Sequence, residues 1–294
     1  MSGALKEVRN RIQSVKSTQQ ITKAMKMVSA AKLRRAQDAI IQMRPYAEKL
    51  QEMLSNIISN AEGDVNMALA AERPVQKVLV IAITSDRGLC GGYNSNIIKL
   101  AKQVIREKYS NLSAGKDNAE LLPLGKKGYE HFSKNKFKVV DRYWNIFSEL
   151  SFEHVAAVAK FAMDAFEKGE VDAVELVYSE FKNAATQKFT VEQFLPVKRT
   201  ERKKGEAKAD FIFEPDKNIL ITELMPKILN TQLYKAILDA HASEHGARMT
   251  AMDKATENAE ELLKTLKISY NRARQAAITT ELTEIVSGAA ALQG

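Results

Sequence analysis

The segment QQITKAMKMVSAAKLRRA, residues 19–36, interrupts a helical pattern that runs through residues 1–60. On both sides of it, apolar residues recur every three or four positions, which is typical of a coiled-coil seam. From Gln19 to Ser29 the seam positions are polar, and the apolar Ile21, Met25 and Val28 lie on a neighbouring stripe. The pairing seam therefore turns polar within this segment. The seam positions in order are Leu5, Val8, Ile12, Val15, Gln19, Thr22, Lys26, Ser29, Leu33, Ala36, Ile40, Met43, Ala47, Leu50, Leu54, Ile57 and Ala61.

A second pattern with the same spacing begins after Pro226 and continues to the C-terminus. Two long terminal helices in one chain bury both stripes most simply by pairing antiparallel. At 1.5 Å per residue the first helix alone would be roughly 85 Å long, which no compact globule of this mass needs. The second set of seam positions is Leu229, Leu233, Ala236, Ala240, Met252, Ala255, Ala259, Leu262, Leu266, Ile278, Leu282, Ile285, Ala289 and Leu292.

The middle of the chain changes to short β-branched runs separated by amphipathic helices, among them Asn94–Lys108 and Phe152–Lys168. This alternation is typical of an α/β sheet with helical crossovers. The expected fold class is therefore α/β, with a Rossmann-like central domain at residues 75–215. A long antiparallel coiled coil of the N-terminal helix, 1–60, and the C-terminal helix, 216–294, completes it. The expected strands are VQKVLVIAIT, AELLPLG, KFKVVD, VDAVELVYSEF, KFTVEQFLPV and DFIFEP.

The positive charge is concentrated at the N-terminal end. The chain has a net charge of +8, and residues 1–60 hold 11 Lys/Arg against 4 Asp/Glu. The first helix is therefore expected to face something acidic, either nucleic acid, anionic lipid or an acidic protein surface. The sequence has no apolar run of membrane-spanning length and no secretory pattern at its start, so we expect neither a membrane span nor export. One cysteine, Cys90, excludes an internal disulfide.

The segment ITSDRGLCGGYN, residues 83–94, leaves an expected strand through a glycine-rich turn into a helix. An open α/β sheet places phosphate or nucleophile sites at such a position. The glycine spacing fits neither dinucleotide-binding nor P-loop motifs, and no Lys follows to reach a phosphate. A tight turn that needs small residues is the favoured interpretation, with Cys90 structural. We therefore expect no catalytic residue and no cofactor here.

The segment HASEH, residues 241–245, fits the H-x-x-E-H pattern of inverted zinc peptidases. Both imidazoles would lie on one helical face, but a zinc site needs a third ligand from another element. We therefore expect no metal, and a His pair that is solvated or faces a partner. Two alternative functions stay open from the residues alone, a basic coiled-coil protein that binds nucleic acid and, with less support, a zinc peptidase.

Three stretches together resemble the gamma subunit family of rotary, F-type ATP synthases. They are RIQSVKSTQQITKAMKMVSAAKLRRAQ (11–37), the glycine-rich turn (83–94), and the C-terminal segment 243–291, which ends in IT-x-E-x-x-E-x-x-x-GA-x-A. The resemblance implies a non-catalytic rotor shaft inside a ring of three alpha and three beta subunits. It also implies a foot that meets the epsilon subunit and the membrane c ring, at the cytoplasmic face of a bacterial plasma membrane. The coupling ion, proton or sodium, belongs to the c ring.

By this resemblance, five residues match family positions that meet the beta subunits or couple the two helices near them. They are Met25, Arg248, Gln275, Thr279 and Glu281. Met25 and its stripe are then expected to face outward, toward the surrounding ring. No catalytic, cofactor-binding or metal site is implied. Gly246 interrupts the C-terminal helix and marks either a softer point or close packing.

Overall fold

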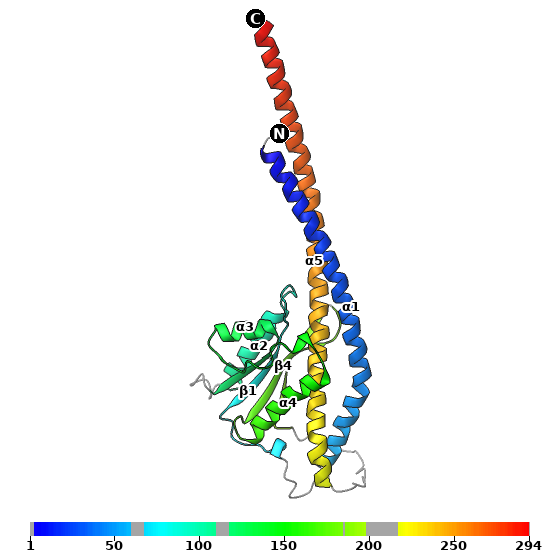
Figure 1. The fold of residues 1–294 in the computed structure, drawn as a ribbon, viewed down its shortest axis with the longest axis vertical. Helices are drawn as coiled ribbons and strands as arrows, with labels where there is room; N and C mark the ends of the chain where they lie inside the picture. The colour runs from blue at the N-terminus through cyan, green and yellow to red at the C-terminus, as the bar shows by residue number, and fades with distance from the viewer. Residues whose placement is uncertain (1–2, 60–67, 110–117, 185, 198–216, 294) are drawn as a thin grey trace. The chain divides into compact units, whose positions relative to one another are not determined.

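The computed structural model contains two long helices and an α/β sheet (Figure 1). The chain separates into two compact units, and each unit takes part of both long helices. The helical unit is Met1–Ser29 with Arg248–Gly294, and the sheet unit is Ala30–Ala247. Among the residues that the structure describes, no helix is both long and apolar enough to cross a membrane. The described residues are 3–59, 68–109, 118–184, 186–197 and 217–293.

Five strands form one sheet in the order β3-β2-β1-β4-β5. The first four run parallel, and β5 returns antiparallel beside β4. The chain moves outward from β1 to β3 and then crosses back to β4, so right-handed crossovers place helices on both faces. This topology confirms the predicted Rossmann-like α/β fold. The strands are β1 Val78–Ile83, β2 Ala119–Leu124, β3 Lys138–Val139, β4 Ala173–Phe181 and β5 Gln187–Leu195.

Two predicted helices are confirmed to within about one residue at each end. These are α2, Tyr93–Glu107, and α4, Phe152–Glu167, whose first turn is capped by the Ser151 hydroxyl accepting from the His154 N–H at 3.3 Å. The short α3, Lys126–Lys134, was not predicted, because nine residues give little periodicity. A sixth expected strand, at residues 210–215, lies outside the described residues. Single 3₁₀ turns occupy Ala68–Ala70 and Ile146–Ser148.

Both faces of the sheet are buried, as a parallel sheet requires. All six residues of β1 are buried, and they alternate between two core clusters. One cluster joins Val80 and Leu121 to Ile97 of α2 and Phe132 of α3. The other cluster lies under α4. The near-continuous apolar sequence of β1 is therefore the consequence of its central position.

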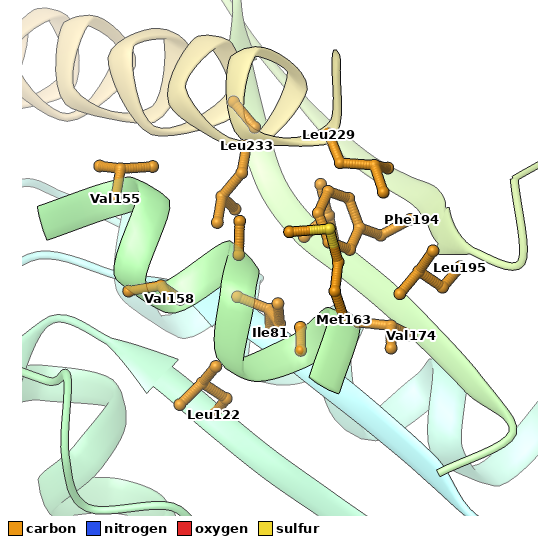
Figure 2. Packing of buried hydrophobic residues seen from close by; sticks show 14 of the residues in the cluster. Ile81, Leu122, Val155, Val158, Met163, Val174, Phe194, Leu195, Leu229 and Leu233 are labelled. Carbon is orange, nitrogen blue, oxygen red and sulfur yellow. The ribbon is translucent and has the colours of Figure 1, made fainter. Parts of the chain in front are cut away.

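The helix α4 and the first part of α5, which spans Lys217–Gln293, both contribute to the core on one side of the sheet (Figure 2). Val155 and Val158 of α4 belong to the same buried cluster as Ile81 of β1. From the α5 side, Leu229 and Leu233 enter the same cluster with 1% and 0% of their surface exposed. The core of the sheet unit on this side is therefore built from the sheet, α4 and α5 together.

The helix α5 contains Pro226, about one turn before Leu229, where the predicted seam begins. A proline inside a helix costs about 3 kcal/mol through its lost N–H and ring clash. Burial of Met225 and Leu229, on either side of it, contributes about 1.5–3 kcal/mol for each side chain. The apolar contacts of this turn therefore outweigh the proline.

In the helical unit, α5 pairs antiparallel with α1, which spans Gly3–Ser59. The Thr22 and Thr256 hydroxyls lie 2.8 Å apart, and one turn later Lys26 pairs with Asp253. As residue numbers rise in α1, those of the partner fall, which confirms the predicted antiparallel coiled coil.

One predicted seam position is wrong. Leu262 is 39% exposed, whereas Leu263 is 8% exposed and takes the place in the seam. Steps of three then four, or four then three, between Ala259 and Leu266 fit a heptad pattern equally well. Only the position of the partner helix decides between them.

Leu233→Ala is expected to destabilise the purified chain by about 2–5 kcal/mol, because it leaves a cavity between α4 and α5. The same substitution at Leu282, which is 57% exposed, is the matched control and should change stability little. Urea unfolding followed by circular dichroism measures both. Equal losses at the two positions would contradict the packing described.

Candidate functional site

The polar part of the α1–α5 seam is satisfied inside the helical unit. Thr22 and Ser29 are buried, with 8% and 2% of their surface exposed. The Thr256 hydroxyl, besides its contact with Thr22, lies 2.7 Å from the Met252 carbonyl, and the Ser29 hydroxyl donates to the Met25 carbonyl at 2.8 Å. Buried hydroxyls without such partners would be costly. The seam therefore keeps its register through its polar part, residues 19–29.

An exposed ion pair and a groove lie beside these hydroxyls. The Lys26 and Asp253 side chains are 40% and 46% exposed, so their pairing is worth at most about 1 kcal/mol and acts mainly on register. The groove has a volume of about 540 Å³. Its lining residues are Gln19, Gln20, Lys23, Lys26, Met27, Asp253, Thr256, Glu257 and Glu260.

Large apolar side chains lie on the surface of α1 next to this groove. Ile21, Met27 and Val28 are 59%, 61% and 58% exposed, so the stripe faces outward as predicted at Ile21 and Val28. Met25 is only half-buried rather than exposed, which corrects the expectation that it faces fully outward. The outer surface of this segment is therefore apolar between its Lys residues.

The C-terminal part of α5 continues past the start of α1. With Thr22 opposite Thr256 and an equal rise in both helices, Gly3 falls opposite about Gln275. Beyond this point the predicted seam residues are exposed, at 45% for Ile278, 57% for Leu282 and 67% for Ile285. The described part of the chain does not cover these side chains.

The five predicted contact residues do not form one cluster. Gln275, Thr279 and Glu281 are exposed within two turns of α5, and the Thr279 hydroxyl donates to the Gln275 carbonyl at 3.0 Å. Arg248 is 7% exposed and lies on the same helix, about 40 Å from Gln275 at 1.5 Å per residue. Met25 is on the other helix. The structure therefore groups three of the residues and separates the other two from them.

The glycine-rich turn after β1 is closed by its own side chains. The Asn94 side-chain oxygen accepts from the Ser85 N–H at 2.9 Å, and the Ser85 hydroxyl donates to the Arg87 carbonyl at 2.7 Å. Cys90 is 2% exposed, and Gly91 has a φ of 58°. The backbone amide that begins the turn is thus occupied by Asn94, not presented to a phosphate. The predicted tight turn is confirmed, and Cys90 is buried within it.

The expectation of a solvated His pair is wrong for His245, which is 5% exposed, whereas His241 is half-buried. The Nε2 atoms of His241 and His245 are 3.2 Å apart, and the His241 ring stacks on Phe147 at 5.8 Å between centroids. Since one nitrogen donates and the other accepts, at least one ring is neutral. Within the described ranges, no group of three His, Cys, Asp or Glu side chains is arranged to hold a metal ion.

Asp239, one residue before Ala240 on α5, is a buried carboxyl that the sequence did not single out. It is 4% exposed. Burial raises the pKa of Asp239 from 3.8 to about 6, opposed by Lys235 and Arg44 and reinforced by Glu180. The carboxyl therefore takes up a proton as the pH falls through about 6.

The chain matches known proteins over nearly its whole length. A family model described as ATP synthase matches residues 4–292. A gamma chain of ATP synthase from Cytophaga hutchinsonii is 52% identical over 292 residues, covering 98% of this chain and 99% of the relative. One from Flavobacterium johnsoniae is 54% identical over 290 residues, covering 99% of each chain. The chain belongs to the ATP synthase gamma chain family.

A solved structure extends this gamma chain likeness to the fold. A chain from the central stalk and c ring of the Tetrahymena thermophila mitochondrial ATP synthase superposes with a TM-score of 0.58 at 27% identity. The match covers 80% of this chain and 99% of that one. The resemblance predicted from the three sequence stretches is confirmed, and the chain is a subunit of an ATP synthase. Membership of the family favours this function over the nucleic-acid-binding and zinc-peptidase alternatives.

Asp239→Asn is expected to change how stability depends on pH. Because the pKa of Asp239 is raised in the folded chain, its contribution to stability is fully present below about pH 3.8 and is lost as pH rises through about 6. The variant lacks this loss, so its stability relative to wild type should rise by up to about 3 kcal/mol between pH 4 and pH 7. Thermal unfolding at several pH values measures it.

The control for this measurement is Glu130→Gln. Glu130 is exposed, and the bond from Lys127 lowers the pKa of its carboxyl, so no such rise is expected. A stability difference between Asp239→Asn and wild type that stays constant with pH would show that Asp239 is not desolvated.

Proposed function

We propose that the chain is the central rotor shaft of an F-type ATP synthase. It couples ion flow through the membrane c ring to conformational change at the catalytic beta-subunit sites, or pumps ions when ATP is hydrolysed. The chain performs no catalysis itself. The observation that carries this proposal is the match to gamma chains at about half identity over both long helices and the sheet.

The helical unit has the properties that a shaft inside a ring of subunits requires. Its C-terminal part carries exposed apolar side chains at Ile278, Leu282, Ile285 and Val286, each at least 45% exposed. Apolar surface of this kind is stabilised by contact with another protein. A ring of three alpha and three beta subunits around it supplies that contact. The excess of Lys and Arg in residues 1–60 favours an acidic inner surface of the ring.

The remaining parts follow from this assignment. Residues 1–60 and 216–294 make the shaft, and residues 75–215 make a foot that meets the epsilon subunit and the c ring. The complex lies peripherally at the cytoplasmic face of a bacterial plasma membrane, which the bacterial origin of the relatives supports. In the shaft, Met25, Arg248, Gln275, Thr279 and Glu281 meet the beta subunits or couple the two helices near them.

Co-expression with the alpha and beta subunits of the same source tests the function. We expect the three chains to purify as one complex that hydrolyses ATP, and alpha and beta without this chain to lack coupled activity. Added epsilon subunit and c ring should join through the foot. Failure of alpha and beta to purify with the chain would refute the proposal.

Met25→Lys is expected to reduce coupling without preventing assembly. The half-buried Met25 would be replaced by a cation that can pair with an acidic ring surface, worth about 0–1 kcal/mol if exposed and more if desolvated. A rotor needs similar contact energies at each stopping position, so even a small added attraction matters. Proton pumping per ATP hydrolysed, measured in membrane vesicles, should fall while hydrolysis persists.

Met53→Lys is the matched control, because Met53 is an exposed methionine near the other end of α1. It should leave the ratio of pumping to hydrolysis unchanged. A ratio equal to wild type in Met25→Lys would show that Met25 does not contact the ring.

A further inference from the structure

The switch point of the sheet lies between β1 and β4, where the chain reverses its direction of winding. In open α/β sheets the crevice at the carboxyl ends of these two strands is where ligands bind. Here a segment of the same chain lies against it. The Tyr93 hydroxyl, at the start of α2 after β1, donates to the Ala240 carbonyl of α5 at 3.0 Å. The hydroxyls of Ser179 in β4 and Ser243 in α5 share a hydrogen bond of 2.7 Å.

The contacts follow one face of α5 along the end of β4. The Asp239 carboxyl accepts a hydrogen bond from the backbone of Phe181, and Ser243 meets Ser179 four residues later. Positions separated by three and four residues share a helix face, so the next contact is expected at Gly246. A Cβ at Gly246 would lie 3.2 Å from both the Cα and the carbonyl oxygen of Ala184. Gly246 therefore marks close packing rather than a soft point in the helix.

The same face extends toward the N-terminal end of α5. Gln232, seven residues before Asp239, donates from its side-chain amide to a Glu192 oxygen of β5 at 2.6 Å. The other Glu192 oxygen accepts from the Tyr178 hydroxyl at 2.9 Å. The β4–β5 hairpin therefore holds α5 through polar contacts from Gln232 to Ser243, over about three helical turns.

The serine and tyrosine hydroxyls that meet α5 at the end of β4 are buried. Ser179, Ser243 and Tyr93 are 0%, 1% and 1% exposed. Apolar side chains alone tolerate a small slide or rotation of a helix across a sheet, because dispersion contacts are not directional. A buried hydroxyl that loses its partner is not rescued by water. The paired hydroxyls therefore permit one register of α5 on the sheet.

We propose that Tyr93, Ser179, Asp239, Ser243 and Gly246 form a clamp that passes torque between the sheet and α5. The clamp holds α5 in one register through the whole rotary cycle. In related topologies the crevice at the carboxyl ends of these strands binds ligands. Here it holds α5, the shaft helix. This inference rests on the proposed function, and the five residues act as positioning residues that touch no substrate.

A disulfide tests whether the register is permanent. The Ser179 and Ser243 oxygens are 2.7 Å apart, close to the sulfur separation of about 2.05 Å in a disulfide. Ser179→Cys with Ser243→Cys, in a Cys90→Ala background, is assembled into the complete ATP synthase and oxidised with diamide, which takes two electrons and two protons from the thiols. We expect ATP synthesis within about twofold of the reduced form, and no effect of diamide on either single-cysteine variant.

Two results would overturn a permanent clamp. A fall in synthesis of about tenfold or more on oxidation, reversed by reduction, would show that α5 moves over the sheet during the cycle. Failure of the two thiols to join would show that the register in the assembled complex differs from this one.

Loosening the clamp tests whether torque passes through it. The double variant Tyr93→Phe, Ser243→Ala removes the hydroxyls of Tyr93 and Ser243. It keeps the aromatic ring at position 93 and the helix α5. In the complete enzyme we expect ATP hydrolysis within about twofold of wild type, and proton pumping per ATP reduced about threefold or more. Ile97→Val, which thins the same core cluster without removing a polar contact, is the control and should leave the ratio unchanged.

The outcomes separate the clamp from the proposed function. If the chain is not the rotor subunit, alpha and beta subunits do not purify with it in any variant. If the chain is the rotor but the clamp does not pass torque, the complex assembles, and the loosened variant pumps as many protons per ATP as Ile97→Val. That second result refutes the clamp alone.

Discussion

The packing of α5 against the sheet unit is the contact on which the rest of the structure depends. A helix of 77 residues has no globular core of its own and is stabilised only by what its apolar face meets. From Met225 to Ala247 that face enters the core of the sheet unit, where Leu229 and Leu233 are fully buried. Burial of this face also offsets the cost of Pro226 inside the helix. The sheet, α4 and this part of α5 therefore form one core.

Small polar pairs set register in both compact units. Thr22 with Thr256 does so in the helical unit, and Ser179 with Ser243 does so in the sheet unit. Short side chains let backbones approach closely, and each buried hydroxyl requires a partner at one position. Larger apolar residues at these positions would bury more surface but would specify the register less tightly. A shaft that must transmit rotation requires positional specificity more than additional burial.

In this chain the carboxyl edge of the Rossmann-like sheet is packed against a helix of the same chain. The turn after β1 has its first amide occupied by Asn94, and Tyr93 reaches the backbone of α5. The carboxyl edge of the sheet therefore meets a helix where a cofactor would lie in other proteins of this topology. The fold alone would have suggested nucleotide binding, whereas the first amide of this turn is held by Asn94.

The sequence by itself determined the two long helices, the α/β alternation, the tight turn at Cys90 and the family. These depend on local periodicity and on short motifs that can be recognised directly in the sequence. It did not decide between Leu262 and Leu263, because both fit a heptad and only the partner helix chooses. Nor did it show that His245 and Asp239 are buried, since a polar residue on a helix has the same local pattern on either face. Burial depends on which elements meet across the core. That information lies in the tertiary structure.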